Sequence, residues 1–377
     1  MKVGLVAGEA SGDLLGAGLI RAIRERAPDA VFEGVAGPAM TNAGCEPVAD
    51  ASELAVFGFV EPLARLPRLL RLRRSLVTRW TQSPPDVFVG IDAPDFNLGL
   101  ETRLRASGVR TAHYVSPSIW AWRPGRVETV RKAADLVLCI LPFEKAIYDK
   151  EGIDAVFVGH PKATTLPLDI DVASAREMLD LGDGQVVAVL PGSRVSEVKR
   201  LGPVFFKAAV MLTGHKSDLR FVTPVASARL RPMIEEQVAA SGIAERFKLT
   251  EGDSIEAMSA ADVVMLASGT AALESALLGK PTVAGYAVSR TTALIAEMLG
   301  AKRTGFRTIP NIIADEELIP EFMQERFDAG SIAQATWDFL ASQERRESVR
   351  ERFAKLRKEL ALGSDDRSAE AIMELAG

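Results

Sequence analysis

Short apolar runs recur along this chain and alternate with longer segments in which apolar residues have helical spacing. Several runs are rich in β-branched residues, which is typical of strands buried in a parallel sheet. In the first half the predicted strands cover Lys2–Ala7, Val31–Ala36, Asp86–Ile91, Thr111–Val115, Leu136–Leu141 and Val156–Gly159. In the second half they cover Val186–Leu190, Phe221–Pro224, Phe247–Thr250, Val263–Leu266 and Thr282–Tyr286. This alternation predicts an α/β protein with doubly wound parallel sheets.

The stretch from His160 to Pro167 has the composition of a linker and separates the two halves. We therefore predict two Rossmann-like domains, residues 1–165 and 166–345, that face each other across a cleft. From Glu344 the chain is strongly charged and has apolar residues at helical spacing. Residues 346–377 are predicted to form helices that pack back toward the first domain. A nucleotide in one domain and an acceptor in the other would suit group transfer.

The turn after the strand Val186–Leu190 is the first candidate binding site. Pro191, Gly192, Ser193 and Arg194 end the strand and lead into a helix. Such a turn offers backbone N–H groups to a phosphate, and Arg194 adds a cationic fork. The alternative is an ordinary turn with a surface arginine.

A second turn of this kind follows the strand Val263–Leu266. Its small and hydroxylated residues allow close approach of a ligand, and an acid follows about one turn later; the candidates are Ser268, Gly269, Thr270 and Glu274. Two such turns favour a ligand with anionic and hydroxylated parts, such as a nucleotide sugar. Glu274 could accept both ribose hydroxyls, or it could be a glutamate at the edge of the core.

The first half carries polar residues after two of its strands. Glu9, Ser11 and Asp13 follow the first strand, without the glycine pattern of a dinucleotide site. Their charge would repel a pyrophosphate, so we expect a sugar or hydroxyl there; otherwise they cap a helix. Asp92 and Asp95 follow the strand Asp86–Ile91 and are candidates for acid–base chemistry. Asp92 leaves the strand first and should lie deepest.

The segment Phe57–Trp80 combines leucines and arginines at helical spacing. It has no acidic residue after Glu61. Such a helix suits an anionic bilayer or lipid, and the residues predicted for this surface are Leu66, Leu69, Arg71, Arg74 and Leu76. The alternative is a crossover helix with its apolar face in the core and its arginines in solvent.

Composition narrows the classes of function. The chain has 377 residues and a net charge of -5, which argues against a general nucleic-acid binder. Its two cysteines and three histidines form no metal-binding pattern, so we expect a reducing compartment and no metal or cofactor. The amino terminus lacks the pattern of a signal peptide, and no apolar run reaches the length of a spanning helix. These features predict a cytoplasmic protein.

Several uncommon strings resemble the lipid-A-disaccharide synthase family, whose members are inverting glycosyltransferases with the GT-B fold. The strings occur in the family's order: Val6-Ala-Gly-Glu-Ala-Ser-Gly-Asp13, Val35-Ala-Gly-Pro38, Val89-Gly-Ile-Asp-Ala-Pro-Asp-Phe-Asn97, His113-Tyr-Val-Ser-Pro-Ser118, Trp120-Ala-Trp122, Leu141-Pro-Phe-Glu-Lys145, Val158-Gly-His-Pro161, Leu190-Pro-Gly-Ser-Arg194, Leu266-Ala-Ser-Gly-Thr-Ala-Ala-Leu-Glu274 and Pro310-Asn311. The segments Lys162–Thr165 and Ser289–Thr308 match less well.

The resemblance implies transfer of 2,3-diacylglucosamine from UDP to the 6-hydroxyl of 2,3-diacylglucosamine 1-phosphate. It implies Asp92 as general base, Ser193 and Arg194 at the diphosphate, and Asn311 as a further contact to the UDP-sugar. It also implies a peripheral location on the inner face of the inner membrane, and leaves a homodimer open. The alternative is another GT-B enzyme acting on a UDP-sugar, such as a UDP-N-acetylglucosamine epimerase or a transferase to a soluble acceptor.

Overall fold

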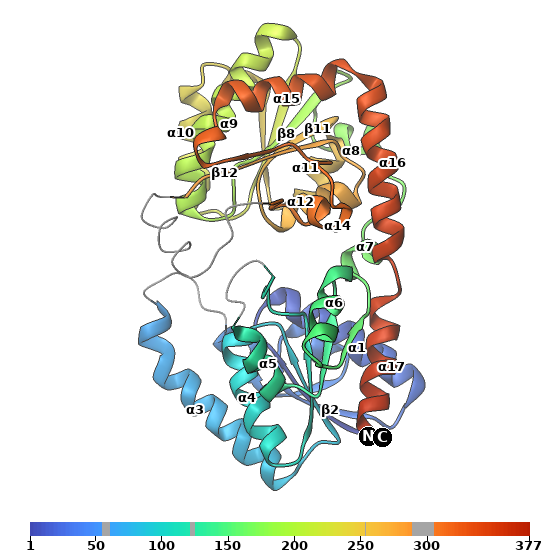
Figure 1. Ribbon diagram of the computed structural model, residues 1–377. Coiled ribbons are helices and arrows are strands. Elements are labelled where there is room, and N and C mark those ends of the chain that lie inside the picture. Colours follow the sequence, from blue (N-terminus) through green and yellow to red (C-terminus); the bar gives the residue numbers. More distant parts are fainter. Residues whose placement is uncertain (55–60, 121–124, 253, 289–304) are drawn as a thin grey trace. The chain divides into compact units, whose positions relative to one another are not determined.

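A computed structural model describes residues 1–54, 61–120, 125–252, 254–288 and 305–377, with the backbone alone for 61–65. These residues form two compact units, and each is built around its own parallel sheet (Figure 1). The first unit contains residues 1–164 and 360–377, and the second contains the rest of the described chain. The prediction of two doubly wound α/β domains is confirmed.

The first unit has a seven-stranded sheet in the order β3-β2-β1-β4-β5-β6-β7. Its strands are β1 (Lys2–Ala7), β2 (Val31–Ala36), β3 (Cys45–Asp50), β4 (Val87–Ile91), β5 (Arg110–Tyr114), β6 (Leu136–Cys139) and β7 (Ala155–Phe157). Its helices are α1 (Ala10–Arg26), α2 (Pro38–Asn42), α3 (Glu61–Gln82), α4 (Pro94–Ala106), α5 (Arg126–Ala133), α6 (Pro142–Lys150), α7 (Pro161–Thr165), which ends at the boundary, and α17 (Ser364–Ala376), with the 3-10 turn η1 (Ala51–Glu53).

The second unit has a six-stranded sheet in the order β10-β9-β8-β11-β12-β13. Its strands are β8 (Val186–Leu190), β9 (Arg220–Val225), β10 (Phe247–Glu251), β11 (Val263–Ala267), β12 (Thr282–Tyr286) and β13 (Glu321–Met323). Its helices are α8 (Val172–Met178), α9 (Val195–His215), α10 (Arg231–Ala240), α11 (Ser254–Ala260), α12 (Thr270–Leu277), α14 (Ile309–Ala314), α15 (Ala329–Ala341) and α16 (Gln343–Leu360), with the 3-10 turns η2 (Ala244–Arg246) and η3 (Gln324–Arg326).

Side chains of successive residues in β1 enter different cores. Leu5 packs with residues of α1 and α17, whereas Val6 packs with Leu76, Trp80 and Phe88 on the side of α3 and α4. This is the two-residue period of a strand that is covered on both faces. It explains why the central strands are continuous apolar runs without a polar face.

Two edge strands were absent from the sequence-based prediction. β3 contains Glu46, Pro47 and Asp50, and most of its residues are exposed or half-buried. β13 has only three residues. Edge strands of this kind carry little apolar signal, because only one side of the ladder and part of one face are covered.

We expected residues 346–377 to pack together toward the first domain. The carboxyl-terminal helices instead divide between the two units at Leu360. Val349 and Phe353 of α16 belong to the core of the second unit. Ala369 and Ile372 of α17 belong to the core of the first unit, where α17 lies beside α1 (Figure 1). The apolar face of each helix therefore fits a different sheet.

Candidate active site

In each sheet the chain winds outward in both directions from two central strands. These are β1 and β4 in the first unit and β8 and β11 in the second. Ala7 is in register with Ile91, and Leu190 with Leu266, so the loops that follow each pair begin side by side. Ligands of open α/β sheets bind beyond the carboxyl ends of strands at such a switch point. The predicted site residues of each unit follow these strands, apart from Asn311.

Asp92 lies on a turn with an unusual backbone. Asp92 and the following Ala93 have φ angles of 51° and 43°, in the left-handed region that residues other than glycine rarely adopt. The turn is held because Asp92 N donates to Tyr114 O at 2.8 Å and Asn97 Nδ2 donates to Asp92 O at 2.8 Å. Asp92 itself stays partly exposed. Strain of this kind is often found where a side chain must be presented to a ligand.

The loop after β1 touches the Asp92 turn. A Cβ atom on Gly8 would lie 2.7 Å from Ala93 Cβ, so the glycine permits this approach. Glu9 at the end of this loop and Ser11 in the first turn of α1 are exposed, and no side-chain hydrogen bond from Glu9 caps α1. Their position beside the turn is compatible with a sugar or hydroxyl ligand.

Asp13 has a different environment from Glu9 and Ser11. Only 5% of it is exposed, and its carboxylate accepts hydrogen bonds from the N–H groups of Gly37 at 2.9 Å, Ala39 at 2.8 Å and Met40 at 3.0 Å. These groups form the start of α2, where an anion is favoured. Asp13 therefore has a structural role, as the capping alternative proposed, but the helix that it caps is α2 and not its own helix α1.

In the second unit, the turn at residues 191–194 is closed by Glu197. Glu197 Oε2 accepts from Ser193 N at 3.0 Å and Arg194 N at 3.3 Å, and Oε1 accepts from Arg194 Nη1 at 2.8 Å. The Arg194 side chain is 76% exposed, whereas that of Glu197 is 13% exposed. The predicted cation is thus available to a ligand, but an acid that the sequence analysis missed already binds it.

The turn after β11 lies next to this one. Ser268 is half-buried and its N–H donates to Gly285 O at 3.0 Å, while Gly269 and Thr270 are exposed at the start of α12. Glu274 is 8% exposed and lies on α12. Small exposed residues followed by a buried acid fit the predicted approach of a ribose.

Tyr286, at the end of β12, is a further residue near these turns. Burial raises the pKa of its phenol, the charge of Glu197 raises it further, and Arg194 lowers it. The phenol is therefore within electrostatic reach of both. An isolated tyrosine at a strand end carries no sequence signal for such a position.

Asn311 was predicted to contact the UDP-sugar, but the structure buries it completely. Its Oδ1 accepts from Leu318 N and Ile319 N, and its Nδ2 donates to Ile319 O and to Glu321 Oε1, all at 2.7–2.9 Å. These bonds use its full hydrogen-bonding capacity. Asn311 therefore organises the loop between α14 and β13 and has nothing left for a ligand.

The predicted lipid surface on α3 also needs a correction. Leu66 is 47% exposed and Arg71 and Arg74 are exposed, while Leu69 is half-buried against the core. Leu76 is fully buried with Trp80, one turn later on the same face. Only the outer face of α3 can contact a lipid. Phe57, where the segment begins, lies outside the described residues.

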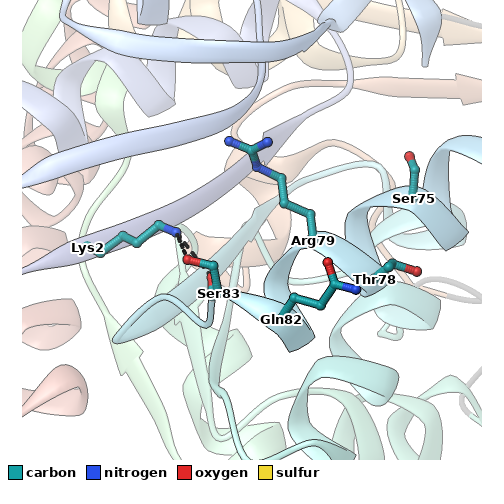
Figure 2. Close-up of a pocket in the computed structure, with 6 residues that line it drawn as sticks. All are labelled: Lys2, Ser75, Thr78, Arg79, Gln82 and Ser83. Carbon is teal, nitrogen blue, oxygen red and sulfur yellow. Dashed lines mark hydrogen bonds between the residues drawn. The ribbon is translucent and has the colours of Figure 1, made fainter.

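A hollow of about 580 Å³ lies at the opposite edge of the first sheet, where β1 begins (Figure 2). It is lined by Lys2 and by residues of α3 and its end: Ser75, Thr78, Arg79, Gln82 and Ser83. Its two cations share one carboxylate, because Lys2 Nζ lies 3.1 Å and Arg79 Nη2 2.7 Å from oxygens of Glu33. It is separate from the strand ends that carry the predicted site.

The described part of the chain lacks two features that would change the functional assignment. No group of three or more histidine, cysteine, aspartate or glutamate side chains there could hold a metal ion. None of the helices there is both long and apolar enough to cross a membrane.

Comparison with known proteins bears directly on this arrangement. The family model described as lipid-A-disaccharide synthetase matches residues 3–375. A lipid-A-disaccharide synthase of Pseudoalteromonas translucida is 43% identical over 376 residues, which cover 100% of this chain and 97% of the relative. One from Serratia proteamaculans is 45% identical over 377 residues, which cover 100% and 98%.

Solved structures support the fold. The UDP-GlcNAc 2-epimerase of Neisseria meningitidis bound to UDP-GlcNAc has a TM-score of 0.68 at 12% identity, with 99% of this chain and 100% of that chain covered. The UDP-GlcNAc 2-epimerase of Methanocaldococcus jannaschii in complex with UDP-GlcNAc and UDP has a TM-score of 0.63 at 12% identity, with the same coverage. The predicted GT-B fold class is confirmed, and at this identity the likeness concerns the fold alone.

The relatives that share sequence over the whole length, at 43% and 45% identity, are lipid-A-disaccharide synthases. The family model covers all but the first two and last two residues. The chain therefore belongs to the lipid-A-disaccharide synthase family.

Proposed function

We propose that this chain transfers 2,3-diacylglucosamine from UDP to the 6-hydroxyl of 2,3-diacylglucosamine 1-phosphate. The products are the β(1→6)-linked disaccharide 1-phosphate and UDP. The observation that carries the proposal is the family match over residues 3–375. The polar strand ends at the two switch points supply side chains of the kinds that this reaction needs.

In this proposal Asp92 is the general base. Its carboxylate takes the proton of the 6-hydroxyl while that oxygen forms a bond to the anomeric carbon of the donor sugar. The bond between the anomeric carbon and the diphosphate oxygen breaks, and its electron pair leaves with UDP. Attack from the face opposite the leaving group inverts the anomeric centre. The fixed turn of Asp92 and Ala93 supports this role because it limits the positions of the carboxylate.

The leaving group needs stabilisation of its developing negative charge. Arg194 would supply a guanidinium, and the start of α9 would supply backbone N–H groups and the positive end of its dipole. Ser193, Ser268, Gly269, Thr270 and Glu274 would hold the rest of UDP, and Glu9 and Ser11 would contact the acceptor sugar. Arg194 and the N–H groups would stabilise the diphosphate without a divalent ion.

We also propose that the protein binds the inner face of the inner membrane through α3. Leu66, Arg71 and Arg74 are exposed on this helix, and both substrates carry acyl chains. A homodimer stays a prediction. The alternative activity, an epimerase or a transferase to a soluble acceptor, is not favoured, because the full-length relatives described above are lipid-A-disaccharide synthases.

One incubation tests the proposed reaction. The protein is mixed with both acylated sugars in the presence of EDTA, and products are identified by mass spectrometry. We expect the disaccharide 1-phosphate and UDP in equal amounts, and much less product when the acceptor lacks its acyl chains. Absence of product with folded protein, with or without Mg²⁺, would contradict the proposed function. Product that appears only after Mg²⁺ is added would contradict the metal-free mechanism.

A further inference from the structure

Glu197 is the N3 residue of a capping box at the start of α9, a position that favours an acid, but its charge opposes the proposed diphosphate ligand. It lies on the first turn of α9, beside the cation and the N–H groups proposed to receive a diphosphate. A permanent negative charge there repels the ligand by Coulomb's law. Glu197 is therefore favourable for the helix and unfavourable for the proposed ligand.

The turn is built around this side chain. Gly192 has a φ of 127°, which favours glycine, and a Cβ atom there would lie 2.6 Å from Glu197 Cβ and 2.8 Å from its Oε2. Any other residue at position 192 would push Glu197 away. The close packing indicates that the position of Glu197 is a fixed part of the turn.

The two oxygens of Glu197 differ in how firmly they are held. Oε2 accepts two backbone N–H groups, from Ser193 and Arg194, and lies at the positive end of α9. Oε1 makes an ion pair with Arg194, whose side chain is 76% exposed. Exposed pairs at this spacing contribute little to stability. Arg194 is therefore easier to displace from this arrangement than Glu197.

We infer that Glu197 is a positioning residue that exchanges Arg194 with the diphosphate. Without substrate, Oε1 holds the guanidinium at the turn. When the UDP-sugar binds, Arg194 moves to the diphosphate, while Oε2 keeps the turn closed. After transfer, Arg194 returns to Glu197, which weakens the hold on UDP and assists its release. The inference rests on the proposed function, in which Arg194 binds the diphosphate.

Two substitutions of Glu197 separate this role from a merely structural one. In Glu197→Gln the side-chain carbonyl can still accept N–H groups from the turn, but the competing charge is gone. We expect UDP to bind about three- to tenfold more tightly. Both the dissociation constant of UDP, measured by calorimetry, and its inhibition constant as a product should fall by this factor. In Glu197→Ala the turn loses its acceptor, and we expect UDP to bind more weakly than to the unmodified protein.

Kinetics supply a second readout. In Glu197→Gln the inhibition constant of UDP should fall while the KM for the acceptor stays unchanged. In the background of Arg194→Ala, the effect of Glu197→Gln on UDP affinity should shrink, because the exchanged group is absent. Glu235→Gln is the matched control, since it removes an exposed ion pair to Arg231 on α10 in the same unit. It should leave UDP affinity unchanged.

Failure of the inference and failure of the proposed function give different results. If Arg194→Ala weakens UDP binding but Glu197→Gln binds UDP as the unmodified protein does, or more weakly, the exchange is wrong and the assignment of Arg194 survives. If Arg194→Ala binds UDP normally, the proposed diphosphate site is wrong and the exchange is wrong with it. Thermal melting of each variant excludes loss of folding as the cause.

Discussion

The carboxylate of Asp92 is presented by a backbone that few residues tolerate. Left-handed conformations at residues other than glycine cost about 1–3 kcal/mol each, and two occur in succession at Asp92 and Ala93. Asn97 offsets this cost, because its buried Nδ2 donates to the carbonyl oxygens of Val6, Ile91 and Asp92. Asn97, in the first turn of α4, thus holds the backbone of the residue that we assign as general base.

Removal of this charge should affect the chemical step. We expect Asp92→Asn to lower kcat about a hundredfold to ten-thousandfold, with little change in the affinity for UDP, because the amide cannot take a proton. Asp95→Asn is the control in the first turn of α4, where Asp95 forms an ion pair with Arg126. Steady-state assays of disaccharide formation measure both. A kcat for Asp92→Asn within tenfold of the unmodified enzyme would argue against Asp92 as the base.

Asn311 should act on folding, not on the ligand. Asn311→Ala deletes the partner of two N–H groups, one carbonyl group and Glu321 inside the second unit. We expect the free energy of unfolding to fall by about 2–4 kcal/mol, measured by urea denaturation. Asn42→Ala, at the exposed end of α2, should change it far less. An Asn311→Ala variant of unchanged stability that fails to bind UDP would restore the original prediction.

Residue types at strand ends could be predicted from the sequence, but their partners could not. Asp13 and Asn311 have the chemistry of ligand-binding residues, and only the structure shows their hydrogen bonds to backbone groups of other elements and loops. Glu197 reads in sequence as an ordinary helical acid, and its contact with Gly192 depends on the turn geometry. The identity of a side chain indicates what it can bind, whereas the fold determines what it does bind.

At the scale of elements, the apolar runs predicted most of the strands and the alternation of strands with helices. Lys2–Ala7, Val31–Ala36, Val186–Leu190 and Thr282–Tyr286 were predicted with the bounds that the structure shows. The edge strands β3 and β13 were missed, because an edge strand is only partly covered and needs no continuous apolar run. Burial of the helices was harder to predict, since α3 has apolar residues on more than one face.

The exposed face of α3 should bind anionic membranes. We expect the combined variant Leu66→Ser, Arg71→Ser and Arg74→Ser to sediment less with vesicles that contain an anionic phospholipid, because it loses apolar and cationic contacts. Arg345→Ser with Arg350→Ser, on the exposed face of α16, is the matched control for lost charge. Equal sedimentation of the α3 variant and the unmodified protein would contradict this surface.

Leu76→Ser tests the corrected part of that helix. Leu76 is fully buried with Trp80, so the substitution should lower the free energy of unfolding of the first unit by about 2–5 kcal/mol. Urea denaturation measures the change. A stable Leu76→Ser variant with weakened vesicle binding would return Leu76 to the lipid surface.

His160, before α7, should make stability depend on pH. Burial, with a smaller contribution from Lys162, lowers the pKa of His160 to about 4. The unfolded chain then binds a proton near pH 6.5, where the folded chain does not, so stability decreases as the pH falls from 6.5 toward 4. In the structure, Lys162 N donates to His160 Nδ1 at 3.2 Å. The variant His160→Asn keeps an acceptor for this N–H group but has no group that titrates in this pH range.

The pH effect is measured as the difference between urea-unfolding curves at pH 7.5 and pH 5. We expect the unmodified protein to lose about 2 kcal/mol more stability than His160→Asn over this range. Equal losses in the two proteins would show that the imidazole is protonated in the folded state at pH 5.

At the scale of the whole molecule, the two units have different tasks in the proposed reaction. Each unit has its own sheet, its own core and its own switch point with polar strand ends. The first presents Asp92 with Glu9 and Ser11, and the second presents Arg194 with Ser268, Gly269 and Thr270. We therefore assign the acceptor alcohol to the first unit and UDP to the second. Family membership supports the overall reaction. Which unit binds UDP can be tested directly.

A crystal structure with bound UDP provides that test. We expect the diphosphate to contact Arg194 and the backbone at Ser193, and the ribose to contact Glu274, with no UDP atom near Asp92. A uridine or diphosphate bound beside Glu9 and Asp92, and distant from Arg194 and Glu274, would contradict the account.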